Sequence, residues 1–348
     1  GERYEGYVRA GLTDADFYAL MQALLNELGD DHSAFLDPEA ARAEADNQFD
    51  FVGIGALVHR LPGVGPQGEA AVITSVFPVS PAAEAGLRSH DLILAVDGGP
   101  VFDEATGESR SLGLAGTDVT VTVQRPGQAA MDLTLTRRQV TGTLPIDYCL
   151  VPGTRLGYIL FPSFDDETID DQTRAALEAM TAAGPLDGLI LANRLNYGGY
   201  DVVADPILGF FTAGLQGYFV SRQERVPLRV RPEEVGNSQT VPLVVLVDTG
   251  TASYGEIVSG VLRVAGRAKI VGQVTYGNVE RLWQYDFEDG SLARIASETF
   301  EPRGAANGVW EETGIIPDVL VPTRWDLFTE ANDPALAAAV QLLQKSNQ

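Results

Sequence analysis

Ser253 stands at a corner of the chain that suits a nucleophile. The apolar run 243–247 predicts a buried strand, a Gly/Thr turn follows, and a helix of small residues is expected to begin at Ser253. Helix N–H groups and the helix dipole at that corner favour negative charge developing on a substrate oxygen. Ser253 and Glu256, three residues apart, also form a capping box, and the pattern alone does not choose between the two roles.

Five segments, taken in order, resemble motifs of the carboxy-terminal processing peptidases, also called tail-specific proteases. The nucleophile segment is Val-Asp-Thr-Gly-Thr-Ala-Ser-Tyr-Gly-Glu-Ile at 247–257. The others are Gly-Asp-Asp-His-Ser-Ala-Phe-Leu at 29–36, the PDZ-like stretch 80–98, Asn-Arg-Leu-Asn-Tyr-Gly-Gly at 193–199 and Gly-Ile-Ile-Pro-Asp at 314–318. Each motif alone is weak, but their order over nearly the whole chain is specific. The resemblance implies acyl-enzyme chemistry on polypeptides without a cofactor.

The chain departs from this family at its general base. The family uses a lysine in T-F-G-K-G, and the ungapped counterpart here is Thr-Tyr-Gly-Asn-Val at 275–279, so Asn278 takes the lysine's place. Leu282 stands where the family has a glutamine. An amide accepts no proton near neutral pH, so a Ser–Lys dyad is excluded at this position. Of the chain's two lysines, Lys345 lies in a polar tail and Lys269 in a probable strand, where a solvated lysine is the usual case.

The tricorn core protease, a more distant relative by resemblance, suggests another base. Its serine works with a histidine from G-T-S-H-A-Y, which corresponds to His32, and with a glutamate from E-N-x-G-V-x-P-D, which corresponds to Glu311 and not Glu312. A histidine can take the serine proton, and a carboxylate on its other nitrogen fixes the tautomer. The competing interpretation is structural, because the processing peptidases carry a histidine at the His32 position while using lysine. Glu311 would then be a solvated loop acid.

The resemblance also assigns two binding elements. The oxyanion hole would use a backbone N–H of Gly198 or Gly199 and the N–H of Tyr254, and glycine suits such a close approach. A plain strand-to-helix turn is the alternative. Tyr197 and Tyr254 replace smaller family residues and are expected to add bulk beside the cleft. A PDZ-like loop would hold a peptide's terminal carboxylate on backbone amides, or its glycines serve only the turn. That loop contains Val52, Gly53, Ile54 and Gly55.

Hydrophobic periodicity predicts an α/β protein in three regions: a helical region 1–48, a PDZ-like β-rich domain 49–140 and an α/β serine peptidase core 141–348. The resemblance gives the core a crotonase/ClpP-like spiral. Short strands are expected at 52–58, 70–77, 92–96, 119–124 and 131–137, the last two forming a hairpin. In the core, strands at 156–160, 186–191, 241–247 and 270–271 alternate with helices at 170–183 and 255–264, which indicates a parallel sheet.

The composition limits the classes of partner that the protein is expected to bind. The formal charge of −24 disfavours binding to nucleic acid and to anionic membranes. The sequence contains no run of about 18 apolar residues, so no integral membrane segment is predicted. One cysteine and three dispersed histidines give no metal-ligand spacing, and His59 and His90 are expected at the surface. The N-terminus does not resemble a signal peptide. The resemblance implies an exported protein, periplasmic or extracellular, with the cytoplasm as the alternative, and leaves oligomerisation open.

The sequence therefore predicts a serine endopeptidase with a Ser253–His32–Glu311 triad, whose substrates the PDZ-like domain recognises through their C-terminal tails. Its rival is a catalytically inactive homologue that binds peptides or other ligands, which Asn278 favours. A triad requires the His32 ring to reach both Ser253 and Glu311, unless a lid or PDZ movement assembles the site.

Overall fold

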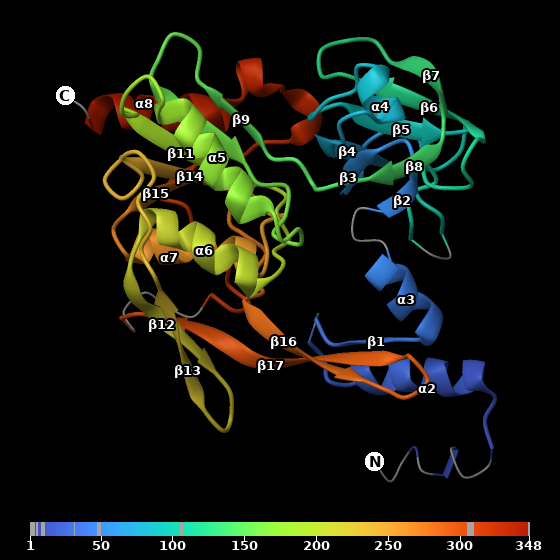
Figure 1. Cartoon of the computed structure of the whole chain (residues 1–348). Coiled ribbons are helices and arrows are strands. Elements are labelled where there is room, and N and C mark those ends of the chain that lie inside the picture. The colour runs from blue at the N-terminus through green and yellow to red at the C-terminus, as the bar shows by residue number, and fades with distance from the viewer. Residues whose placement is uncertain are drawn as a thin grey trace.

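The computed structural model describes residues 4, 6–7, 11–30, 32–46, 50–104, 107–304 and 310–346. Asp31, part of the predicted 29–36 motif, lies outside these residues. The α/β class expected from the sequence is confirmed (Figure 1). The chain forms a parallel core sheet covered by helices, a separate antiparallel domain, and a long β ribbon that carries the N-terminal helices.

The core is built on a six-stranded sheet in the order β18-β15-β14-β11-β10-β9, parallel except for the edge strand β9. Its central strands are wholly apolar and buried, as strands covered on both faces must be. The elements are β9 (Asp147–Leu150), β10 (Leu156–Leu160), α5 (Ile169–Thr181), β11 (Gly188–Ala192), α6 (Asp201–Phe211), β14 (Leu243–Val247), α7 (Tyr254–Val264), β15 (Ala268–Gly272), β18 (Val319–Leu320) and α8 (Pro334–Ser346). Helices α5, α6 and α7 pack on one face, and α8 packs on the other.

A second sheet runs from the core as a ribbon. Strand β17 pairs with β16 on one side and with β1 and β12 on the other, so the N-terminal strand is tied to the C-terminal half of the chain. Helix α2 lies along this ribbon (Figure 1). The elements are α2 (Asp14–Asn26), β1 (Ala34–Leu36), α3 (Pro38–Asp46), β12 (Gly214–Val220), β13 (Arg225–Val230), β16 (Glu280–Asp286) and β17 (Leu292–Pro302).

The expected PDZ-like strands form an antiparallel sheet in the order β3-β4-β5-β6-β7, with β2 paired to β8 beside it. The predicted strand 52–58 is wrong as one unit. It breaks at Gly55, whose φ is 80° and whose added Cβ would lie 2.2 Å from the Ser80 Cβ. The elements are β2 (Asp50–Gly53), β3 (Ala56–Pro62), β4 (Glu69–Val76), α4 (Pro81–Glu84), β5 (Leu92–Val96), β6 (Asp118–Gln124), β7 (Met131–Thr136) and β8 (Arg138–Thr141).

This antiparallel domain packs against the core through a shared apolar cluster. Side chains of β4 and β5 contact Leu195 of the core, together with Trp325 and Phe328 from the segment of short helices η2 (Trp325–Leu327) and η3 (Glu330–Asn332). His90 was expected at the surface, and that prediction is wrong. Its side chain is 0% exposed because the ring stacks on Trp325 at 4.4 Å between centroids.

Candidate active site

Ser253 occupies the sharp turn between β14 and α7. Its backbone has φ 50° and ψ −126°, a conformation that costs a non-glycine residue about 1–3 kcal/mol and persists only where the surroundings enforce it. The Ser253 N–H donates to Asn278 O at 2.7 Å and the neighbouring Ala252 N–H donates to Asn196 O at 3.0 Å, which holds the turn from both sides. The strained turn places a half-buried hydroxyl at the helix N-terminus.

The capping-box interpretation of Ser253 and Glu256 is wrong. The Ser253 side chain makes no capping hydrogen bond. The fully buried Glu256 carboxylate instead accepts from the Thr275 hydroxyl and from the N–H groups of Gly277 and Asn278, both at 2.8 Å. Burial raises the pKa of Glu256 although these donors oppose the shift. Glu256 therefore braces the 275–278 loop and leaves the Ser253 hydroxyl uncommitted.

The loop carrying Gly198 and Gly199 lies directly against the serine. A Cβ added to Gly198 would stand 2.7 Å from the Ser253 Cβ and 2.9 Å from the Tyr254 N, so only glycine fits there. The Gly198 N–H already donates to Asn196 Oδ1 at 2.9 Å. Within the described part of the chain, no hydrogen bond uses the N–H of Gly199 or of Tyr254. Of the three predicted oxyanion residues, these two have N–H groups that no hydrogen bond in the described structure uses.

Buried polar groups fix this loop to the nucleophile turn. Asp248 accepts from the N–H of Leu195 at 2.9 Å and from the Trp325 indole at 2.8 Å. The neighbouring Arg194 is 1% exposed and forms an ion pair with Asp333. The loop is thus tied both to the turn after β14 and to the C-terminal segment on which the PDZ-like domain packs. No local sequence signal identifies the Arg194–Asp333 pair.

The structure brings the segments of His32, Glu311 and Ser253 to one loop, residues 278–280. His32 precedes β1, and its Nδ1 lies 3.7 Å from an oxygen of Glu280. Glu311 accepts the Val279 N–H at 2.8 Å, one residue away from Glu280. The Ser253–His32–Glu311 triad itself stays a prediction. Glu280 is a neighbour of His32 that the sequence pattern did not reveal.

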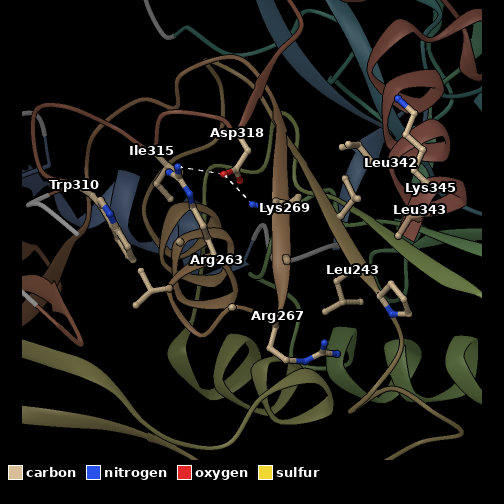
Figure 2. Close-up of a pocket in the computed structure, with 16 residues that line it drawn as sticks. Leu243, Arg263, Arg267, Lys269, Trp310, Ile315, Asp318, Leu342, Leu343 and Lys345 are labelled. Carbon is tan, nitrogen blue, oxygen red and sulfur yellow. Dashed lines mark hydrogen bonds and ion pairs between the residues drawn. The ribbon is translucent and has the colours of Figure 1, made fainter. Parts of the chain in front are cut away.

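Neither lysine supplies a base in this arrangement. Lys269 pairs with Asp318 at 3.7 Å, its side chain is 68% exposed, and it lies on the wall of a cavity of about 820 Å³ (Figure 2). Lys345 lines the same cavity. Residues from the last turn of α7 also line it, whereas Ser253 precedes the first turn of that helix. The expectation of a solvated Lys269 is confirmed.

Asn278, at the family's lysine position, is 4% exposed. Its main chain links two parts of the site. Its N–H donates a hydrogen bond to Glu256, and its carbonyl accepts one from the Ser253 N–H. Its side-chain Oδ1 is buried and accepts no hydrogen bond among the described residues. Leu282, at the family's glutamine position, lies on β16 and is partly buried.

The two tyrosines near the site behave differently. Tyr197 is 48% exposed, as expected for a residue that adds bulk beside a cleft. Tyr254 is 5% exposed, and its ring packs against Phe219 at 6.0 Å between centroids. The expectation of open bulk is therefore wrong for Tyr254, because α7 turns this side chain into the core.

The predicted carboxylate-binding loop lies at the bend between β2 and β3. Ile54 is 1% exposed, its carbonyl accepts the Ala82 N–H at 2.8 Å, and the Gly55 carbonyl accepts the Phe77 N–H at 3.0 Å. Val52 and Gly53 belong to β2, which pairs with β8. The carbonyls at the bend are thus used within the domain, so a ligand would have to be held by N–H groups.

Two further classes of site are absent from the described residues. No three or more His, Cys, Asp or Glu side chains there are grouped to hold a metal ion. No helix there is long and apolar enough to cross a membrane.

A strained serine turn, a glycine loop against it and an α/β core with a PDZ-like domain define the serine peptidase class. Residues 155–321 match peptidase family S41, and residues 52–135 match the PDZ domain. The carboxyl-terminal-processing protease of Synechocystis sp. is 30% identical over 353 residues, covering 97% of this chain and 80% of that protein. The chain therefore belongs to peptidase family S41, among its PDZ-containing carboxy-terminal processing proteases.

Two further similar proteins are also named as C-terminal processing proteases. The carboxy-terminal processing protease CtpB of Bacillus subtilis is 28% identical over 312 residues, which cover 86% of this chain. This chain spans 62% of the length of that protein. Among solved structures, the photosystem II D1 C-terminal processing protease superposes with a TM-score of 0.60 at 26% identity, covering 92% of this chain and 86% of that one.

Proposed function

We propose that this protein is a serine endopeptidase in which Ser253 attacks the peptide carbonyl. The observation that carries the proposal is the turn itself. Ser253 is held at φ 50°, its hydroxyl caps no helix, and no hydrogen bond in the described structure uses the N–H groups of Tyr254 and Gly199 beside it. A strained serine at a strand-to-helix corner with two adjacent N–H donors is the arrangement used for acyl transfer.

His32 is the base that we assign to this serine. Asn278 cannot accept a proton, and Lys269 pairs with Asp318 in a cavity at the far end of α7. A carboxylate beside His32 Nδ1 would leave Nε2 to take the serine proton. Glu311 is the orienting carboxylate expected from the sequence, and Glu280 is its rival because it makes the 3.7 Å contact in this structure.

The proposed reaction follows from these positions. Ser253 Oγ bonds to the carbonyl carbon while its proton passes to His32, and the N–H groups of Tyr254 and Gly199 stabilise the resulting oxyanion. The proton then moves to the leaving amine, the C–N bond breaks, and an acyl-enzyme remains on Ser253. A water activated by His32 hydrolyses the ester and restores the serine. A triad of this kind requires the His32 Nε2 to lie within hydrogen-bond reach of the Ser253 Oγ.

The PDZ-like domain is proposed to select substrates by their C-terminal tails. An extended peptide added at the bend between β2 and β3 would place its terminal carboxylate on the N–H groups of residues 52–55. The bend at Gly55 supports this role, and it serves the packing against Ser80 equally well. An amidated tail should then be cleaved more slowly than the same tail with a free carboxylate.

The nucleophile is tested by hydrolysis of an unstructured protein. Ser253→Ala should abolish cleavage and leave the thermal melt unchanged, because the serine hydroxyl makes no hydrogen bond that the fold needs. Cleavage that persists in the purified variant would remove Ser253 from the mechanism. His32→Ala should lose most activity, and Lys269→Ala, the matched control, should keep it. The reverse pattern would assign the base to lysine.

The rival function is a peptide-binding protein of the same fold. The observation that favours it is Asn278, which occupies the lysine position with a buried amide. A wild-type protein that binds unfolded peptides but cleaves none of them would establish this alternative. Export to the periplasm or the cell exterior is also proposed, and fractionation of the producing cells measures it.

A further inference from the structure

The strand that follows the active-site loop has an open edge. Among the described strands β16 pairs only with β17, and the two run out from the core as a long ribbon (Figure 1). The Phe287 N–H donates to the Ser291 carbonyl at 2.9 Å, so every second residue back along β16 directs its backbone groups toward β17. The N–H and C=O groups of Leu282, Gln284 and Asp286 therefore point away from the sheet, and no hydrogen bond among the described residues uses them.

A row of half-exposed aromatic side chains follows the same strand. Trp283, Tyr285 and Phe287 occupy alternate positions, which places them on one face of the ribbon, and they are 43%, 46% and 44% exposed. The Trp283 indole N–H donates to Glu298 at 3.3 Å, which holds the ring in place. At the other end of the row, Phe287 packs against Phe35 of β1, on which α2 lies. The row thus extends from the helix α2 toward the active-site loop.

An open backbone edge with apolar side chains at every second position is a surface to which an extended polypeptide adds as a further strand. β16 has 7 residues, a length of about 20 Å, and contains neither the proline nor the lysine that commonly blocks a free edge. Hydrogen bonds to the outward backbone groups would supply affinity, and the aromatic row would select the side chains of the added strand.

The beginning of β16 lies beside the proposed nucleophile. The Asn278 carbonyl accepts the Ser253 N–H at 2.7 Å, the Val279 N–H donates to Glu311, and Glu280 is the first residue of β16. The Cα atoms of Asn278 and Glu280 are therefore at most about 7 Å apart. A polypeptide that lies along this edge has one end close to the serine.

Charge distinguishes the possible occupants of the edge. In a symmetric pairing of two copies centred on Trp283, Glu280 of each copy would stand opposite Asp286 of the other, and like charges that face each other across strands are destabilising. Each chain also carries a formal charge of −24, so two copies repel each other. A neutral or basic polypeptide meets neither penalty.

We propose that the free edge of β16 is a docking strand for the substrate, which it holds as an extended, neutral or basic segment with apolar side chains at alternate positions. This inference rests on the proposed function, because the bound segment is part of the polypeptide that Ser253 cleaves. The docking strand differs from the PDZ-like loop because it needs no terminal carboxylate. It therefore binds interior segments of a polypeptide as well as its tail.

Peptide binding to Ser253→Ala tests the docking strand without requiring catalysis. The probe is a fluorescein-labelled, amidated peptide with valine at alternate positions and threonine or lysine between them, and fluorescence anisotropy gives its Kd. Gln284→Pro removes an outward N–H at an edge position that tolerates proline, and it should weaken binding about tenfold or more. Tyr285→Ser should weaken binding about threefold to tenfold. Tyr148→Ser, which changes an equally exposed tyrosine on the edge strand β9, is the matched control and should leave the Kd unchanged.

The outcomes separate this proposal from the proposed function. A Kd that both β16 variants leave unchanged, with a wild type that cleaves an unstructured protein, overturns the docking strand and leaves the peptidase standing. If the wild type cleaves nothing, the peptidase is overturned, and the same Kd values still decide whether the edge binds an extended polypeptide. A wild type that sediments as a dimer, with a Gln284→Pro variant that sediments as a monomer, assigns the edge to a second copy and overturns the proposal. Thermal melts verify folding, and Tyr285→Ser, which keeps every backbone group, decides the question if the proline variant does not fold.

Discussion

Acidification should loosen the contact between the PDZ-like domain and the core through His90. The ring is fully buried between Trp325 and Phe328, with Glu330 3.6 Å from its Nε2. Burial above all, with Arg194 and Arg88 acting in the same direction and Asp333 opposing them, lowers the pKa of His90 to about 3. The folded protein therefore holds this histidine neutral at pH values where the unfolded chain protonates it.

The magnitude follows from linkage. An unfolded histidine has a pKa of about 6.5, so between pH 6.5 and 3 the unfolded state binds more protons and the free energy of unfolding falls as the pH falls. With a folded pKa of about 3, the His90 contribution lost between pH 7 and pH 5 is about 2 kcal/mol. Burial also lowers the pKa of His59, which adds a loss of the same sign.

The assay compares urea unfolding of wild type and His90→Phe at pH 7 and pH 5, followed by tryptophan fluorescence. Phenylalanine keeps the aromatic stack and removes the titrating group, while His59 is present in both proteins, so the difference isolates His90. Wild type should lose about 2 kcal/mol more than the variant between the two pH values. Equal losses, or a larger loss in the variant, would refute the burial argument.

Two further predictions concern the active site. Gly198→Ala should abolish hydrolysis and lower the Tm, because the added Cβ would stand 2.7 Å from the Ser253 Cβ at a φ of 106° that strains alanine; kcat/KM and a thermal melt measure the two losses. Glu311→Gln should lower kcat by as much as about 10⁴-fold if this carboxylate orients the histidine, while exposed Glu312→Gln should cost little. If Glu280→Gln is the damaging change and Glu311→Gln is not, the orienting role belongs to Glu280.

The core sheet was predictable because each central strand is a short apolar run between turn signals. The β14 run, the α7 helix and the corner between them follow from local periodicity alone. Helix α6 was not anticipated, because Pro206 interrupts its pattern. Seven buried residues pack the helix into the core and offset the lost hydrogen bond.

The contacts that define the site depend on residues far apart in the sequence. The predicted capping box was wrong because the Glu256 carboxylate accepts hydrogen bonds from a loop about twenty residues later and not from the backbone at Ser253. The approach of Glu280 to His32 spans most of the chain and has no local signal. His90 was assigned to the surface by residue type, and the aromatic side chains that bury it come from the C-terminal segment.

Covalent labelling of Ser253 tests the central claim most directly. Intact-mass spectrometry after incubation with a fluorophosphonate should show one adduct per chain, peptide mapping should place it on Ser253, and Ser253→Ala should take up none. His32→Ala should label far more slowly, because the serine then lacks its base. A folded wild type that cleaves an unstructured protein while its Ser253 remains unlabelled, or that labels at another residue, would contradict the assignment.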